Sequence, residues 1–268
     1  MLDQGHGPPL VVIPGVQGRW EWLRPALDAL ARNHRVISYT LAGDFGSGVR
    51  YDPALGFDNY VNQLDQVYRG AGLEQASLCG ISYGGLIAMK YAAIMPRRVT
   101  SLVIVSSPAP GWTPTPQQQR FVRRPWVSAP LFVLTAPRRL FPEIRAAYPS
   151  WAARLGFSAV HAARVLAAPM IPSLMAGRVR LQQSLDFAPD CARVTAPTLV
   201  ITGEEQLDRV VPAAVTRRYA QLIPGARLAT IERTGHLGTV TRPDRFAELV
   251  GEHVQATIGR WERDASNF

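Results

Sequence analysis

The stretch "LCGISYGGLIAMK", residues 78–90, places Ser82 midway between Gly80 and Gly84. An apolar strand-like run precedes the serine, and a helix-like run follows it. A turn this tight leaves no room for side chains two residues before or after the serine. We therefore expect a sharp turn that lifts the Ser82 hydroxyl clear of a sheet and places a helix N-terminus beside it. The alternative is a small-residue turn that only packs a helix against a strand.

Outward from this turn, short apolar runs alternate with helix-length segments. Such alternation predicts a mostly parallel sheet with helices on both faces. Ligands bind at the carboxyl ends of the strands in such sheets, which is where Ser82 falls. The expected strands are 10–13, 35–39, 76–81, 101–106, 198–202 and 227–232, and the expected helices are 20–32, 57–71, 83–95, 213–222 and 243–258.

The alternation stops between residues 108 and 190, which contain no strand candidate. A proline-rich entry, "PAPGWTPTP", is followed by an apolar run broken by prolines and then by helical pieces. The helical pieces are expected at 141–148, 150–167 and 173–186. We therefore predict a core formed by 1–107 and 191–268, and a helical cap formed by 108–190.

A serine hydroxyl is a weak nucleophile and needs a base, usually a histidine oriented by a carboxylate. Of the five histidines, only His236 in "RTGHLG" comes just after the carboxyl end of a predicted strand. It should therefore lie at the same edge of the sheet as Ser82. His161, within the predicted cap, is the weaker alternative because it would have to overhang the site.

The carboxylate is expected in the loop after the fifth predicted strand, "ITGEEQLDRVVP". Asp208 is favoured because two residues and a Val-Pro pair follow it, and proline is common at the start of a helix. Glu205 is the next choice after Asp208, and Glu204 in the same loop is also a candidate. Asp208 would also suit a purely structural role as a helix N-cap.

Two backbone N–H groups are candidates for stabilising an oxyanion. The N–H of Tyr83 directly follows the serine at the start of the predicted helix. A second donor should come from the loop after the first strand, "IPGVQG", where Val16 is the first choice and Gln17 is close behind.

These motifs together resemble the α/β-hydrolase superfamily, in its capped, esterase-like branch. "VVIPGVQG" is similar to the family's oxyanion loop, "GISYGG" to its nucleophile elbow and "RTGHLG" to its histidine loop. The order Ser82, Asp208, His236 is also that of the family. The family's N-terminal antiparallel hairpin should be reduced or missing, because only nine residues precede the first predicted strand. An edge exposed in this way could pair with another subunit and give a homo-oligomer.

The resemblance implies a serine hydrolase that cleaves a small-molecule carboxylic ester through an acyl-enzyme, without metal or cofactor. Thioesters, lactones, amides, carbon–carbon bonds of diketones and esters on an acidic carrier protein are alternative substrates for the same triad. A ligand receptor of hydrolase fold is a third possibility. Gln17, Trp20, Trp112, Trp126 and Phe132 are expected to line the substrate pocket, although packing of the cap on the core would also account for the aromatic residues.

The composition is that of an ordinary soluble globular protein, with 47% hydrophobic and 18% charged residues. No uncharged apolar stretch of about 18 residues is present to span a bilayer, and no signal segment opens the chain. We therefore expect a cytoplasmic protein.

The charge is unevenly distributed. The formal net charge is +9, and residues 114–190 carry ten arginines against three acidic residues. Such a surplus can steer an acidic partner such as a carrier protein, or it can be a solvated surface. No nucleic-acid-binding motif accompanies it, so nucleic acid is not an expected partner.

Overall fold

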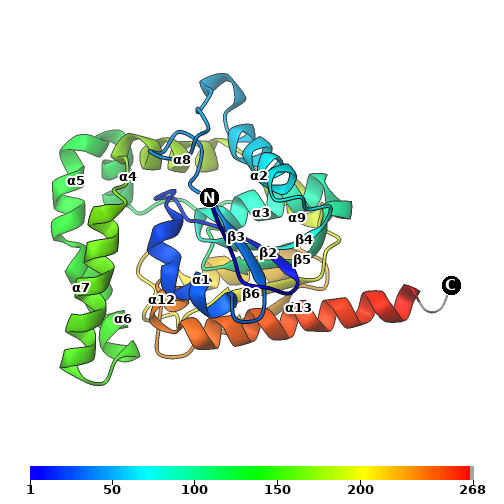
Figure 1. The fold of residues 1–268 in the computed structure, drawn as a ribbon. Helices are drawn as coiled ribbons and strands as arrows, with labels where there is room; N and C mark the ends of the chain where they lie inside the picture. Colours follow the sequence, from blue (N-terminus) through cyan, green and yellow to red (C-terminus); the bar gives the residue numbers. More distant parts are fainter. Residues whose placement is uncertain (266–268) are drawn as a thin grey trace.

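A seven-stranded sheet runs through the centre of the molecule in the order β1-β3-β2-β4-β5-β6-β7 (Figure 1). The computed structural model describes residues 1–265, with side chains as far as residue 257. All neighbouring strands are parallel except β1 and β3. This confirms the predicted fold class. The strands are β1 Leu2–Gln4, β2 Pro9–Ile13, β3 Arg35–Ser38, β4 Ala76–Ile81, β5 Val99–Val105, β6 Thr198–Thr202 and β7 Arg227–Thr230.

The family's N-terminal hairpin is reduced to β1. This three-residue strand pairs antiparallel with β3, with Leu2 opposite Ser38 and Gln4 opposite Val36, and not with β2, which follows it in the chain. The edge of β3 is therefore covered along much of its length by a strand that the sequence patterns did not predict.

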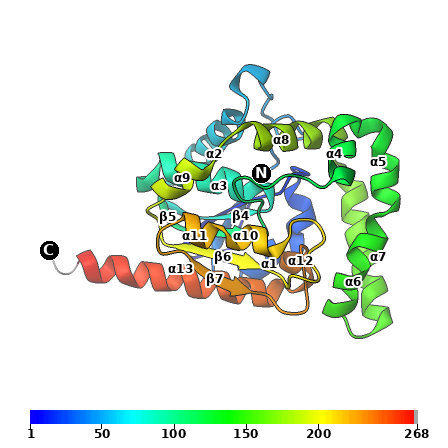
Figure 2. The same cartoon turned by 180° about the vertical axis from the view of Figure 1, so that it is seen from behind.

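Helices cover both faces of the sheet because its central strands are apolar on both sides. In β2, Leu10 and Val12 pack in one core cluster with α1 and α13, whereas Val11 and Ile13 pack in the other with α2 and α3. Figures 1 and 2 show α13 on one side of the sheet and α2 and α3 on the other. The core helices are α1 Arg24–Leu30, α2 Asp58–Gly70, α3 Tyr83–Ile94, α10 Ala213–Arg217, α11 Tyr219–Leu222, α12 Gly238–Thr241 and α13 Pro243–Ala265, with short 3-10 turns η1 Trp20–Leu23, η2 Pro53–Leu55 and η3 Pro96–Arg98.

The last strand, β7, was predicted to be buried, but most of its residues are exposed. Arg227, Leu228 and Thr230 of β7 are all exposed. The reason is its place at the edge of the sheet, where it has a partner strand on one side only. A local run of apolar and β-branched residues does not reveal whether a strand is central or at an edge.

The segment between β5 and β6 is helical, and its part from α4 to α7 stands to one side of the sheet in both views, whereas α8 lies above the core and α9 lies beside α3 (Figures 1 and 2). We call residues 108–190 the insertion. Its helix α5 was not expected, because Pro130 lies inside it; packing against α4 and α8 supports this helix despite the lost N–H. The helices are α4 Pro116–Arg123, α5 Pro125–Leu134, α6 Ala136–Ala147, α7 Trp151–Ala167, α8 Pro172–Ser184 and α9 Ala188–Arg193.

The expected boundary between residues 190 and 191 falls within α9, which packs against α3 of the core. Among residues 1–265, no single helix is long and apolar enough to cross a membrane. Helices α7 and α8 are long and apolar enough only when they are taken together, and the chain bends by 93° between them.

Candidate active site

Ser82 lies in a strained turn between β4 and α3. Its backbone has φ 54° and ψ −121°, a region that residues other than glycine rarely adopt. A Cβ on Gly80 would lie 2.3 Å from the carbonyl oxygen of Gly84, and a Cβ on Gly84 would lie 2.3 Å from that of Ile13. A side chain at either glycine would therefore displace backbone, which is the physical reason for the glycine spacing around the serine.

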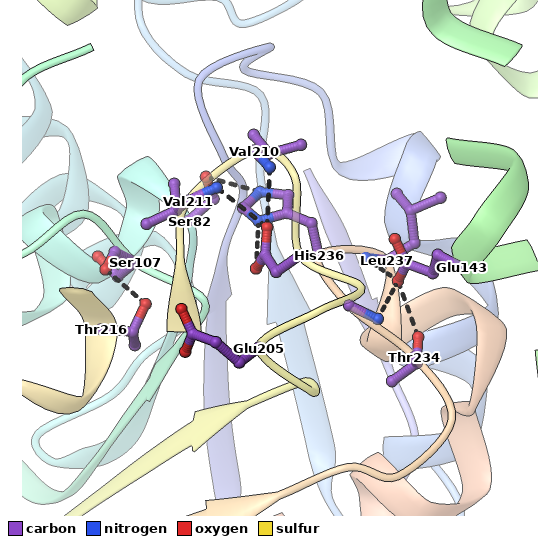
Figure 3. Close-up of polar contacts among 12 residues, drawn as sticks. Ser82, Ser107, Glu143, Glu205, Val210, Val211, Thr216, Thr234, His236 and Leu237 are labelled. Atoms are coloured by element: carbon purple, nitrogen blue, oxygen red, sulfur yellow. Dashed lines mark hydrogen bonds and ion pairs between the residues drawn. The ribbon is translucent and has the colours of Figure 1, made fainter. Parts of the chain in front are cut away.

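The side chains of Ser82, His236 and Asp208, each from a separate loop, form one hydrogen-bonded chain at the carboxyl edge of the sheet. Figure 3 shows the His236 ring beside Ser82. With Nδ1 protonated, His236 donates to Oδ2 of Asp208 at 3.2 Å. Its other ring nitrogen, Nε2, lies 3.2 Å from Oγ of Ser82 and can accept that hydroxyl's proton. The structure thus brings together the three residues singled out from the sequence, although they lie up to 154 positions apart.

The orientation of Asp208 is fixed by its second oxygen. Oδ1 accepts hydrogen bonds from the N–H groups of Val210 and Val211, each at 3.0 Å, so Oδ2 is left to face the histidine. The alternative acid, Glu205, points elsewhere: its Oε2 accepts from the N–H of Ala214 at 2.7 Å, in the first turn of α10. Of the two carboxylates, Asp208 is the one that contacts the imidazole.

The electrostatic surroundings of His236 favour its charged form. Burial lowers the pKa of His236, but the nearby Asp208 carboxylate, by charge and hydrogen bond, raises it, and the charge of Glu143 adds to this. The net effect places the pKa above the ordinary histidine value. An imidazolium formed when the ring accepts a proton from Ser82 would therefore be stabilised in place.

The predicted oxyanion loop passes directly beside the serine. A Cβ on Gly15 would lie 3.2 Å from Cβ of Ser82 and 2.8 Å from Oε1 of Gln17. Tyr83 is the first residue of α3, so its N–H lies in the first helical turn and has no partner within the helix. Val16 lies in the same loop, next to Gly15 and Gln17.

The position of that loop depends on a residue that the sequence patterns did not single out. Arg178, in α8, is completely buried and donates from Nη1 to the carbonyl oxygen of Val16 at 2.9 Å. The same guanidinium forms an ion pair with buried Asp44 and donates to the hydroxyl of Tyr60. In the sequence, Arg178 was only one of ten arginines in a basic segment.

The aromatic residues predicted for the pocket are dispersed. Trp20 is partly buried against the core cluster that contains α1, and Trp112 is partly buried in the loop after β5. Phe132 packs on Phe121 within the insertion, with ring centroids 5.0 Å apart. Trp126 is 64% exposed on α5, which both views place at the outer edge of the molecule.

A second buried carboxylate touches the histidine loop. Glu143, in α6 of the insertion, uses Oε1 to accept hydrogen bonds from Oγ1 of Thr234 at 2.8 Å, the N–H of Gly235 at 2.7 Å and the N–H of Leu237 at 2.6 Å. Burial raises the pKa of Glu143, although these bonds oppose the shift. Its only signal in the sequence is that it is a rare acidic residue in a basic segment.

Residues 10–249 match the family model described as the Alpha/beta hydrolase family, and the chain belongs to that family. It is therefore a hydrolase by family. The protein named "Putative carbamate hydrolase RutD" from Azorhizobium caulinodans is 29% identical, over 92% of this chain and 91% of that protein. A pimeloyl-[acyl-carrier protein] methyl ester esterase of Nitrosomonas europaea is 27% identical, over 90% and 94%. Among solved structures, the enol-lactonase of Burkholderia xenovorans LB400 superimposes with a TM-score of 0.77 at 21% identity, over 95% of both chains.

Proposed function

We propose that this protein is a serine hydrolase that cleaves carboxylic esters through an acyl-enzyme, with Ser82, His236 and Asp208 as its catalytic triad. The observation that carries the proposal is the hydrogen-bonded chain from Asp208 through His236 to Ser82, which lies partly exposed on a strained turn. Three residues from separate loops, in this order and geometry, have the arrangement that serine activation requires.

In the proposed reaction, Oγ of Ser82 attacks the ester carbonyl carbon while Nε2 of His236 takes the hydroxyl proton. Asp208 holds the ring through Nδ1–H and stabilises the imidazolium. The N–H groups of Tyr83 and Val16 donate to the oxyanion of the tetrahedral intermediate. His236 then gives the proton to the leaving alcohol, and a water molecule, activated by the same ring, hydrolyses the acyl-enzyme.

The test is hydrolysis of p-nitrophenyl esters from acetyl to palmitoyl by the wild type and by Ser82→Ala. We expect the substitution to lower kcat by about 10⁴-fold or more while the protein stays folded. Ser106→Ala is a matched control, because Ser106 is a buried serine with positive φ at the end of the neighbouring strand β5 and is outside the hydrogen-bonded chain. If Ser82→Ala kept activity within a few-fold of the wild type, the proposal would be wrong.

A second candidate substrate is an ester attached to an acidic carrier protein. The insertion exposes basic side chains, and one relative is named as an esterase for an acyl-carrier-protein ester. Its exposed arginines are Arg120, Arg123, Arg124, Arg138, Arg145 and Arg180.

On this candidate, kcat/KM for a carrier-bound ester should fall with rising salt and in the double variant Arg123→Glu, Arg124→Glu, whereas hydrolysis of the free ester should not. Equal effects on both substrates would exclude a carrier. A carbamate belongs in the same substrate panel because of the relative named as a carbamate hydrolase.

A further inference from the structure

Glu143 joins the insertion to the loop that holds the proposed catalytic histidine. Its side chain extends from α6 and is buried, with 1% of the residue exposed. A single carboxylate oxygen accepts from three donors in the segment 234–237 (Figure 3). Two of these donors are the backbone N–H groups of Gly235 and Leu237, the residues on either side of His236.

The two N–H groups need this acceptor. A buried N–H without a partner is costly, and hydrogen bonds to a carboxylate are stronger than those to a neutral acceptor. On its other side, the loop is packed tightly against the segment that carries the acid: a Cβ on Gly235 would lie 2.5 Å from the carbonyl group of Leu207. The backbone around His236 is thus confined between the Asp208 loop and Glu143.

The second effect of Glu143 is its charge. The charged groups that act on His236 are Asp208, from the loop after β6, and Glu143, from α6; the Ser82 hydroxyl faces the remaining ring nitrogen. Glu143 makes no direct contact with the imidazole among the hydrogen bonds of the described residues, so it acts through the backbone and through space.

We propose that Glu143 is a positioning residue that couples the docking of the insertion to the placement of His236 over Ser82. The inference rests on the proposed function, because it assigns Glu143 a role in the same reaction. On this reading the histidine is held correctly only while α6 is docked against its loop.

Two substitutions separate the two effects. Glu143→Gln keeps an acceptor oxygen and removes the charge. We expect the plateau kcat to stay within several-fold of the wild type while the acid limb of kcat/KM moves to lower pH. Glu143→Ala removes the acceptor as well and should lower kcat by about 10²-fold with little change in KM, as a small misplacement of a catalytic group does.

Asp190→Asn is the matched control. Asp190 is also a buried carboxylate of the insertion, but its partner at 2.8 Å is Lys90 of the core helix α3. This variant should lower the thermal midpoint without moving the acid limb. The ring pKa of His236, followed by NMR in the wild type and Glu143→Gln, gives a readout that needs no turnover, and circular dichroism shows whether each variant is folded.

Several outcomes would overturn the inference. They are a folded Glu143→Ala variant with wild-type kcat, a Glu143→Gln variant whose His236 pKa is unchanged, and an equal shift of the acid limb in Asp190→Asn. These are distinct from failure of the proposed function, which would show as a wild type without esterase activity or as an active Ser82→Ala variant.

Discussion

The sharpest test of the proposed triad is Asp208→Asn, because the structure determines how the new amide must lie. Oδ1 of Asp208 accepts from two backbone N–H groups, those of Val210 and Val211. An asparagine oxygen has to take over this position, since turning the NH₂ group toward two N–H donors would leave both unpaired. Each unpaired buried donor costs about 1–3 kcal/mol. The NH₂ group therefore faces Nδ1 of His236.

An amide donor at Nδ1 forces the imidazole into the wrong tautomer. The ring proton moves to Nε2, which then cannot accept the proton of Ser82. We expect kcat to fall by about 10⁴-fold at neutral pH, equivalent to about 5 kcal/mol of transition-state stabilisation. The thermal midpoint should change little, because both backbone hydrogen bonds survive. The assay is p-nitrophenyl ester hydrolysis with thermal denaturation in parallel.

Glu205→Gln is the control from the same loop, because this carboxylate is bonded to the N–H of Ala214 and not to the imidazole. It should keep kcat within a few-fold of the wild type. A folded Asp208→Asn variant that retained a tenth or more of wild-type kcat would refute the reasoning, as would a loss in Glu205→Gln that matched that of Asp208→Asn.

Two further predictions follow from the same site. The proposed base, His236, must be neutral to accept a proton, and its pKa is raised above the ordinary histidine value. We therefore expect kcat/KM to fall as the pH drops through a pKa higher than that of an unperturbed histidine. A pH–rate profile with its acid limb below the ordinary histidine range would contradict this. Gly84→Ala would drive a Cβ against a carbonyl oxygen at 2.3 Å, and we expect a loss of about 2 kcal/mol or more in the free energy of unfolding. The matched change Gly156→Ala, in α7 where a Cβ meets nothing within 4 Å, should stabilise the protein slightly, and denaturant unfolding of both variants measures the difference.

The sheet and the meeting of Ser82, Asp208 and His236 at one edge of it could be predicted because their signals are local. A strand–turn–helix with glycines around Ser82 defines the turn, and parallel strands bring the segments after their carboxyl ends to one edge. His236 and Asp208 each follow the carboxyl end of a predicted strand, as Ser82 does. Because parallel strands end at the same edge of the sheet, the three residues are expected to lie close together without any knowledge of the packing.

The remaining features depend on tertiary packing, which no local pattern encodes. Strand β1 is only three residues long, and α5 contains a proline that argues against a helix. Glu143 is 94 positions away from Leu237, whose N–H it binds, and Arg178 is 162 positions away from Val16, whose carbonyl oxygen it binds. Neither residue belongs to a periodic or spaced motif, so only the folded structure reveals their contacts.

The strained backbone at Ser82 has an evolutionary consequence. Its φ of 54° lies where glycine is comfortable and serine is not, so the chain would be more stable with glycine at this position. The backbone therefore disfavours serine here, and on the proposed function the catalytic hydroxyl is what offsets this cost. In a lineage that no longer needed the hydroxyl, drift toward greater stability would favour its loss while the sheet, the turn and the insertion persisted. A relative with glycine here would be a folded protein that has given up this chemistry.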